Sequence, residues 1–255
     1  RIALLPRPQA TSLQPWRKDL VFILDVSGSI SQAKLNEFIQ GVRLALPRMA
    51  ADDRFEIIAF RHREYRLFGE FRQPTAENLK AADEFLFKLQ RVGSTNIYAA
   101  LTPLLADGIR APDRPLLVFL CSDGQVNFGE IVDSRELINT FSNRNRDNAS
   151  IFCFSAGAYA NPFLMDLLSY RNRGESRQTE GIARSRLALA AMIEQVADVV
   201  VADLDYQVSS ELANDTFPKR LPHLYRSQPL TIYGRYPAGT REIGLRLVGR
   251  DAFGE

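Results

Sequence analysis

Four short runs of mostly apolar residues constrain the fold of this chain more than any other feature. They are residues 19–25, 54–60, 115–121 and 150–157. Each run has the length of a strand, and the segments between them are longer and carry apolar residues at helical spacing. Strands that are apolar on both faces are typical of a parallel sheet covered by helices on each side. The alternation predicts an α/β fold with a doubly wound, mostly parallel central sheet flanked by helices.

Helix-start residues support this interpretation. Ser31 and Thr75 are typical N-cap residues, and Asn161 is followed by Pro162, which is favoured at the first helical position. We expect a loop at 93–96 and an edge strand within 64–71. Helices are expected at residues 32–50, 97–109, 131–143 and 186–197. Two more are expected to begin at residues 75 and 161.

The pattern changes after about Asp205. Segments 229–236 and 241–250 are expected to form two strands separated by a turn, which could pair with each other only as a hairpin. Ile2–Leu5 is expected to form a further short strand. Because an isolated hairpin is only marginally stable, we expect Ile2–Leu5 to join the tail strands. This predicts a main domain at 19–203, inserted into a small β-rich appendage formed by 1–18 and 206–255.

Composition excludes some classes of partner. The chain has 32 basic and 30 acidic residues, a net charge of +2, which gives no reason to expect nucleic acid or an anionic membrane as partner. The basic segments 61–66 and 171–177 are typical of solvated surface and would also attract an acidic partner. The apolar runs are too short for direct membrane insertion. The chain begins with Arg and shows no signal peptide, so we interpret it as an excised or processed fragment.

The two cysteines, Cys121 and Cys153, lie inside apolar strand-like runs. A chain of this length does not need a disulfide for stability. We therefore expect both to be buried free thiols that pack as small hydrophobic side chains.

Polar residues gather where the expected strands end. Asp25 ends the first apolar run and is followed by Ser27 and Ser29, Asp123 follows the run 115–121, and Thr95 lies in a loop before a helix. Ligands of open α/β sheets bind at the carboxyl ends of the strands. We therefore expect these five side chains to converge on one surface site.

Two carboxylates and three hydroxyls form a set of hard oxygen donors that suits Mg²⁺, and Mn²⁺ or Ca²⁺ would also fit. Two carboxylates leave the ion with bound water and an open position for an incoming carboxylate. The alternative is that Asp25 and the serines only cap the following helix. D-V-S-G-S alone does not decide between these interpretations, but three such segments in the expected order favour the metal site.

The segments D-V-S-G-S (25–29), G-S-T-N-I (93–97) and C-S-D-G (121–124) resemble the metal-ion-dependent adhesion site of von Willebrand factor A (vWA) domains. The resemblance spans roughly residues 19–203. It implies that Ser27, Ser29 and Thr95 are hydroxyl ligands and that Asp25 and Asp123 bind the metal directly or through water. It also implies a protein partner that offers an exposed Asp or Glu side chain.

Two further segments, 161–174 and 217–236, resemble a narrower group, the inter-alpha-trypsin inhibitor heavy chains and their bacterial relatives. The chain departs from that group at Ser94, where a second glycine is more common. The resemblance favours an extracytoplasmic location, whether secreted, periplasmic or on the cell surface.

We therefore predict a divalent-metal-dependent protein-interaction or adhesion module that is not an enzyme and has no catalytic residues. A serine nucleophile would need a histidine, and neither His62 nor His223 follows a motif that would bring it to Ser27 or Ser29. An aspartyl phosphotransferase would need a second acid at Ser27, so a magnesium-dependent hydrolase is the less favoured alternative. A structural module whose metal only stabilises the fold is the other alternative.

Overall fold

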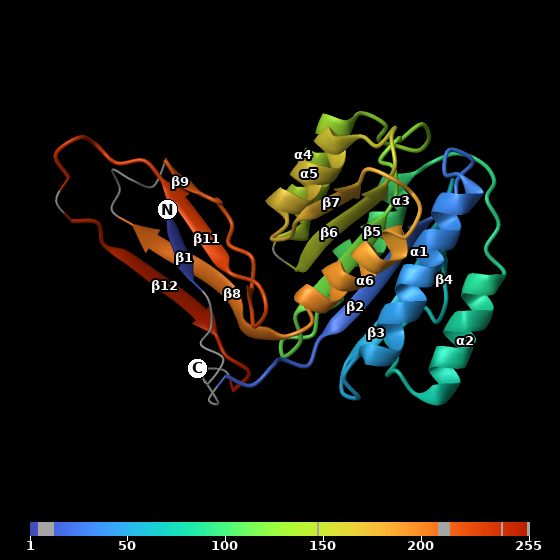
Figure 1. Ribbon diagram of the computed structural model, residues 1–255, viewed down its shortest axis with the longest axis horizontal. Coiled ribbons are helices and arrows are strands. Elements are labelled where there is room, and N and C mark those ends of the chain that lie inside the picture. Colours follow the sequence, from blue (N-terminus) through green and yellow to red (C-terminus); the bar gives the residue numbers. More distant parts are fainter. Residues whose placement is uncertain (5–12, 147, 209–214, 241, 254–255) are drawn as a thin grey trace. The chain divides into compact units, whose positions relative to one another are not determined.

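The structure is a computed structural model that describes residues 1–4, 13–146, 148–208, 215–240 and 242–253. The chain forms two compact units (Figure 1). The larger unit is Arg17–Glu194, and the smaller one combines Arg1–Trp16 with Gln195–Glu255.

The larger unit is built on a six-stranded sheet with the order β4-β3-β2-β5-β6-β7. All neighbouring pairs are parallel except β3 and β4, which are antiparallel. The predicted fold class, a doubly wound and mostly parallel sheet, is confirmed. The strands are β2 (Asp19–Asp25), β3 (Arg54–Phe60), β4 (Glu64–Arg66), β5 (Leu116–Cys121), β6 (Ala149–Ala156) and β7 (Ser176–Thr179).

Helices cover both faces of this sheet (Figure 1). One apolar cluster joins alternate residues of β2, β5 and β6 to helices α3, α4 and α5. On the other face Phe38 of α1 packs edge-on against Phe154 of β6, and Arg43 of α1 pairs with Asp83 of α2. The helices are α1 (Gln32–Ala45), α2 (Ala76–Phe87), α3 (Ile97–Leu101), α4 (Ser134–Asn145), α5 (Pro162–Arg171) and α6 (Ser185–Gln195), with short 3-10 turns η1 (Leu46–Arg48) and η2 (Thr102–Leu105).

The predicted helix starts are confirmed at three positions. The side chains of Ser31, Thr75 and Asn161 each accept a hydrogen bond from a backbone N–H in the first turn of their helix. Two elements differ from expectation. The helix predicted over 97–109 ends as an α-helix at Leu101, because Pro103 lacks the N–H that would continue it. The polar residues Ser176–Thr179, for which no strand was predicted, form the edge strand β7.

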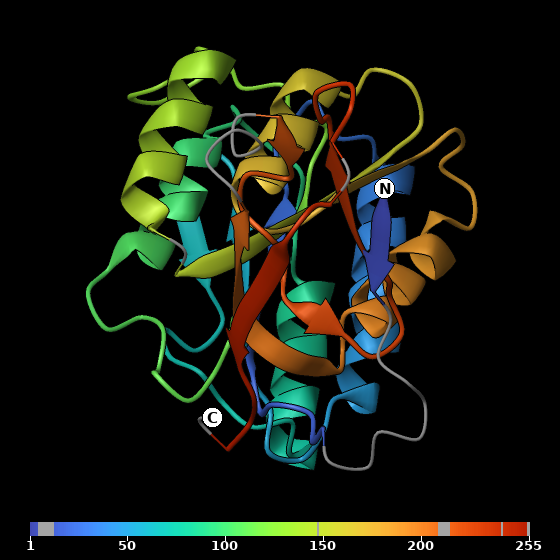
Figure 2. The ribbon, with the colours of Figure 1, turned by 90° about the vertical axis from the view of Figure 1, so that its left-hand side faces the viewer.

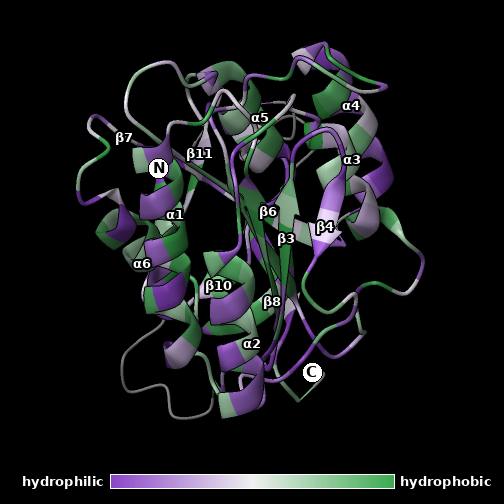
Figure 3. Cartoon of the chain, turned by 90° about the vertical axis from the view of Figure 1, so that its right-hand side faces the viewer, coloured by the Kyte–Doolittle hydropathy of each residue, from purple (hydrophilic) through white to green (hydrophobic). Residues whose placement is uncertain are grey.

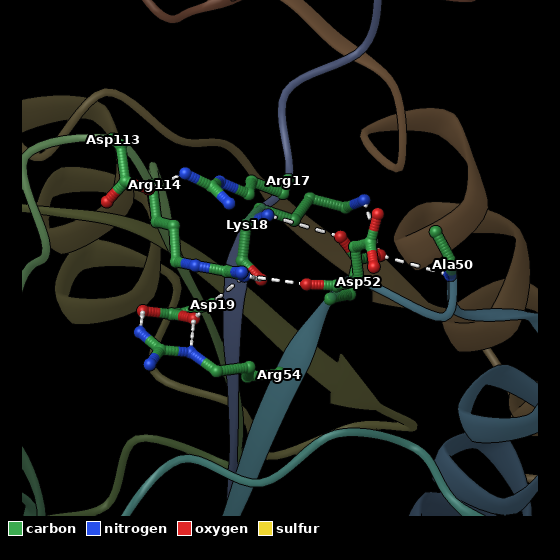
Figure 4. Close-up of polar contacts among 9 residues, drawn as sticks. Arg17, Lys18, Asp19, Ala50, Asp52, Arg54, Asp113 and Arg114 are labelled. Carbon is green, nitrogen blue, oxygen red and sulfur yellow. Dashed lines mark hydrogen bonds and ion pairs between the residues drawn. The ribbon is translucent and has the colours of Figure 1, made fainter.

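A network of buried charges fixes the amino end of β2 (Figure 4). Asp19 is fully buried and accepts two hydrogen bonds from Arg54, at 2.8 and 2.7 Å. Lys18 is also buried, and its Nζ lies 2.7 Å from a carboxylate oxygen of Asp53. Arg114 donates to the backbone carbonyl of Asp52. These paired charges tie the start of the central strand to the loop that precedes β3.

The smaller unit contains two three-stranded sheets, β1-β11-β9 and β10-β8-β12, all antiparallel. Residues Ile2–Leu4 pair with Leu230–Ile232, so the first residues of the chain lie beside its tail (Figure 2). Leu5 of the predicted strand and Arg241 of the predicted tail strand lie outside the described residues. The strands are β1 (Ile2–Leu4), β8 (Val199–Val208), β9 (Thr216–Phe217), β10 (Leu224–Tyr225), β11 (Leu230–Gly234) and β12 (Leu245–Arg250).

The predicted hairpin of the two tail strands is wrong. Among the described residues β11 pairs with β1 and β9, whereas β12 pairs with β8. The two strands belong to different sheets, and the side chains of Leu204, Leu221, Leu230 and Ile232 form the buried core of this unit. The strand β8, which begins inside the predicted 19–203 domain, has β10 and β12 as its partners.

Cys121 and Cys153 are free and fully buried, as expected. Burial raises the pKa of both thiols, which keeps them protonated and unreactive. In the described part of the chain, no helix is both long and apolar enough to cross a membrane.

Candidate metal centre

Three hydroxyl groups from two loops meet beyond the carboxyl ends of the central strands. The Oγ atoms of Ser27 and Ser29 are 2.9 Å apart, and Thr95 Oγ1 lies 2.8 Å from Ser27 Oγ and 3.4 Å from Ser29 Oγ. Ser27 and Thr95 are buried, whereas Ser29 is exposed. The three oxygens therefore form a compact triangle that solvent reaches from the side of Ser29.

A backbone contact holds the two loops together. The N–H of Gly28 donates to the carbonyl of Gly93 at 2.8 Å. A Cβ atom at Gly28 would lie only 3.3 Å from that carbonyl oxygen, so a larger residue would push the loops apart. Glycine at this position lets Ser27 and Ser29 approach Thr95.

Asp25, the last residue of β2, is held in place beside the hydroxyls. One carboxylate oxygen accepts a hydrogen bond from the N–H of Ser27 at 2.9 Å, and the other accepts from the hydroxyl of Ser122 at 2.6 Å. Asp25 is fully buried. The protein therefore orients both oxygens. The helix that follows is capped by Ser31, and not by Asp25, Ser27 or Ser29. The interpretation as helix caps is therefore wrong.

Asp123 lies at the end of the neighbouring strand β5. Its carboxylate accepts a hydrogen bond from the N–H of Gln125 at 3.0 Å, and its carbonyl accepts one from the N–H of Asn161 at 2.7 Å. Asp123 is also buried, so both carboxylates of the predicted surface site are themselves buried groups. Of the five predicted ligands only Ser29 is exposed, so an ion would reach the carboxylates from its side.

Two further residues contribute to the site although the sequence did not single them out. Ser122 orients Asp25 through its hydroxyl, and Asn127 accepts a hydrogen bond from the N–H of Thr95 at 2.8 Å. Ser122 falls inside the C-S-D-G motif, where its side chain could have been considered. Asn127 has no recognisable signal, because only the fold brings residue 127 next to residue 95.

Burial dominates the electrostatics of the site. It raises the pKa of Asp25 from 3.8 to about 6, and the nearby charge of Asp123 adds to this. The hydrogen bonds from Ser122 and Ser27 lower the pKa and offset part of the rise. Two carboxylates this close and this buried repel each other when both are ionised.

The residues fit a divalent cation. No Lys, Arg or His of the described residues forms an ion pair with Asp25 or Asp123, yet buried carboxylates are normally paired or bound to metal. The part of the chain that is described holds no cluster of three or more His, Cys, Asp and Glu side chains for a metal. The donor set here is instead two carboxylates with three hydroxyls. Neighbouring ligands of an octahedral Mg²⁺ are about 2.9 Å apart, which is close to the distances from Ser27 Oγ to Ser29 Oγ and to Thr95 Oγ1.

The family model described as "von Willebrand factor type A domain" matches residues 18–178. The chain therefore belongs to the von Willebrand factor type A domain family. It is similar to the inter-alpha-trypsin inhibitor heavy chains, being 24% identical over 232 residues to inter-alpha-trypsin inhibitor heavy chain H2 of Sus scrofa. That match covers 88% of this chain but only 25% of the relative.

Solved structures share the fold. A von Willebrand factor type A protein from Catenulispora acidiphila aligns with 92% of this chain and 55% of its own, with a TM-score of 0.71 and 16% identity. Proximal thread matrix protein 1 from the mussel byssus, "with zinc occupied MIDAS motif", aligns with 77% of this chain and 48% of its own, with a TM-score of 0.55 and 15% identity.

Proposed function

We propose that this chain is a divalent-metal-dependent protein-interaction module, and that Asp25, Ser27, Ser29, Thr95 and Asp123 hold the metal. The hydroxyls of Ser27, Ser29 and Thr95 are its direct ligands, and the two aspartates bind directly or through water. Mg²⁺ is the proposed ion, and Mn²⁺ or Ca²⁺ would also suit oxygen ligands. The zinc in the mussel protein's site is a precedent for a metal bound at this place in the fold.

One observation carries the proposal: two buried carboxylates, which pair with no cationic side chain among the described residues, lie beside three hydroxyls that are 2.8 to 3.4 Å apart. A cation would neutralise the carboxylates and replace the hydrogen bonds among the hydroxyls. The two carboxylates balance the charge of a divalent ion and the hydroxyls add none, so where the aspartates bind through water the direct ligands of the ion are neutral.

The partner follows from these neutral direct ligands. An ion whose direct protein ligands are neutral hydroxyls favours a carboxylate as a further ligand, and the exposure of Ser29 leaves one side of the site open. We propose that an exposed Asp or Glu side chain of a partner protein binds there. The family likeness further favours an extracytoplasmic location for the parent protein.

We propose no enzymatic activity. Among the described contacts, no hydrogen bond joins His62 to Ser27 or Ser29, and the Nδ1 atom of His223 instead accepts one from the N–H of Asp203 in the smaller unit. A serine hydrolase would need such a base next to its nucleophile. The remaining alternative is a closed metal site that only stabilises the fold.

Water-proton relaxation with Mn²⁺ separates these alternatives. A metal with an open position holds exchanging water, so Mn²⁺ binding should enhance relaxation, and added acetate should reduce the enhancement by displacing that water. A closed structural site would give little enhancement and no response to acetate. Thr95→Val should weaken Mn²⁺ binding, whereas Thr95→Ser, which keeps the hydroxyl, should bind as the parent chain does.

A further inference from the structure

The larger unit has a pocket that is separate from the proposed metal ligands. It has a volume of about 270 Å³ and lies between the ends of β2 and β3 and the end of α2. Its lining residues are Val26, Ala59, Arg61, Tyr65, Phe85, Lys88, Leu89 and Gln90. The volume is slightly below the usual range for ligand sites, roughly 300–1,000 Å³, so the pocket suits a compact ligand.

The floor of this pocket is apolar and rigid. Val26 and Ala59 are buried, and the backbone of Val26 donates to the carbonyl of Phe60 and accepts from the N–H of Val92. Phe85 and Leu89 add half-buried apolar side chains from the α2 side. β3 is mostly hydrophobic in Figure 3, whereas α2 alternates between hydrophobic and hydrophilic residues. The backbone at the end of α2 is satisfied within the helix, because Lys88 N and Leu89 N donate to carbonyls of Phe85 and Leu86.

Two cationic side chains, Arg61 and Lys88, complete the pocket. Arg61 donates from Nε to the hydroxyl of Tyr65 at 2.9 Å, and its guanidinium carbon lies 4.9 Å from the centre of that ring. This contact fixes the guanidinium and leaves its terminal nitrogens for another acceptor. Within the described residues neither Arg61 nor Lys88 forms an ion pair, unlike Arg66, which pairs with Glu64.

We propose that this pocket binds a small carboxylate attached to an apolar group. The apolar part would lie on Val26 and Ala59 between Phe85 and Leu89, and the carboxylate would bind Arg61 and Lys88. Arginine held in place by an aromatic ring is well suited to a carboxylate because its planar donors need little reordering. The site does not depend on the metal, since none of the five proposed metal ligands lines it.

The test is a titration of the labelled chain, followed by NMR of its backbone amides in excess chelator. The probes are 4-phenylbutyrate, its neutral amide and acetate. We expect saturable shifts centred on Val26, Ala59 and Leu89 with 4-phenylbutyrate, and at least about tenfold weaker binding of the other two probes. Equal affinity for the amide would overturn the role of the cations. Shifts centred on Ser27 and Thr95, or loss of binding in chelator, would move the ligand to the metal site.

Matched variants sharpen the test. Arg61→Gln should weaken 4-phenylbutyrate binding about tenfold or more, and Arg61→Lys should lose less, because it keeps the charge but not the planar donors. Arg63→Gln is the control, because Arg63 also contacts Tyr65 but does not line the pocket. Lys88→Gln should weaken binding several-fold, whereas Lys80→Gln on the same helix should not. Unchanged affinity in both Arg61→Gln and Lys88→Gln would disprove the proposal.

Discussion

At the scale of single residues, Asp25 links the fold to the proposed chemistry. It ends the central strand, is fully buried, and has both carboxylate oxygens oriented by Ser27 and Ser122. Keeping such a group ionised without a nearby cation costs folding free energy. The metal-free chain should therefore be less stable at neutral pH than a bound metal would make it.

The raised pKa of Asp25 gives this cost a pH dependence. The pKa of Asp25 is about 6 in the folded chain and 3.8 in the unfolded chain, so the folded state holds this proton more tightly. The resulting contribution to folding stability is fully present below about pH 3.8 and is lost as the pH rises through 6. The loss from this group alone is about 3 kcal/mol. Urea unfolding in chelator should show Asp25→Asn with a smaller fall in stability between pH 5 and pH 7 than the parent chain. An identical fall in both proteins would contradict the assignment. With metal present, affinity should decrease as the pH falls below 6.

Ser122 is expected to act through Asp25. Removing its hydroxyl in Ser122→Ala frees one carboxylate oxygen of Asp25 and removes a hydrogen bond that lowers the pKa of that group. We expect Mn²⁺ affinity to fall about 10- to 100-fold and the pKa of Asp25 to rise above 6. Calorimetry and carboxyl NMR measure the two effects. Ser150→Ala is the control, since Ser150 is buried in β6 and its hydroxyl has no partner among the described residues. Equal losses in both variants would mean a general packing effect.

The sequence predicted the hydroxyls and carboxylates of the candidate site better than their surroundings. Asp25, Ser27 and Ser29 are close in sequence and follow a recognisable strand, so their convergence is a local property. The burial of Asp123 and the contact of Asn127 with Thr95 depend on how two distant loops fold over each other. No spacing within either loop encodes that arrangement.

At the scale of elements, the sheet is joined across three strands by stacked phenylalanines. Phe22, Phe119 and Phe152 occupy aligned positions of β2, β5 and β6, with ring centres 5.6 and 5.2 Å apart. All three are almost fully buried. The parallel register places the rings side by side, which adds to the stability gained from burial.

Phe119 is the middle ring, so its loss should cost most. Phe119→Ala should reduce the free energy of unfolding by about 3–5 kcal/mol, because it leaves a cavity between two rings. Phe87→Ala should change it by less than about 0.5 kcal/mol, since that side chain is 82% exposed. Chemical denaturation of both variants measures the difference. Similar costs for the two would contradict the stacked core.

The elements that the sequence predicted well are those buried on two faces. β2, β3, β5 and β6 are apolar on both sides, so their runs stand out without any knowledge of the fold. The edge strand β7 reads Ser-Arg-Gln-Thr and is exposed or half-buried. Its pairing with β6 comes from the backbone alone, and so its sequence carries no strand signal.

At the scale of the whole molecule, the two ends of the chain share one unit. Residues Ile2–Leu4 pair with Leu230–Ile232, and the larger unit occupies the sequence between them. We propose that the larger unit is an insertion into the smaller one. Its boundaries of 19–203, expected from sequence, remain a prediction.

Deletion of residues 1–4 tests this dependence. The strand β11 would lose one of its two neighbours, so the amides of Leu230–Ile232 should exchange with deuterium at least about tenfold faster. Amides of β2 and β5 should exchange as before, because both strands lie within the larger unit. Unchanged protection of β11 would show that the tail does not depend on the first strand.

The central claim is that Asp25, Ser27, Ser29, Thr95 and Asp123 hold a divalent cation, and the most direct measurement is anomalous diffraction from crystals grown with Mn²⁺. We expect one anomalous peak about 2.1 Å from the hydroxyl oxygens of Ser27 and Ser29, and no peak there in crystals of Asp25→Asn. A Mn²⁺ ion bound by other residues, or an accessible site without a peak at saturating Mn²⁺, would contradict the claim.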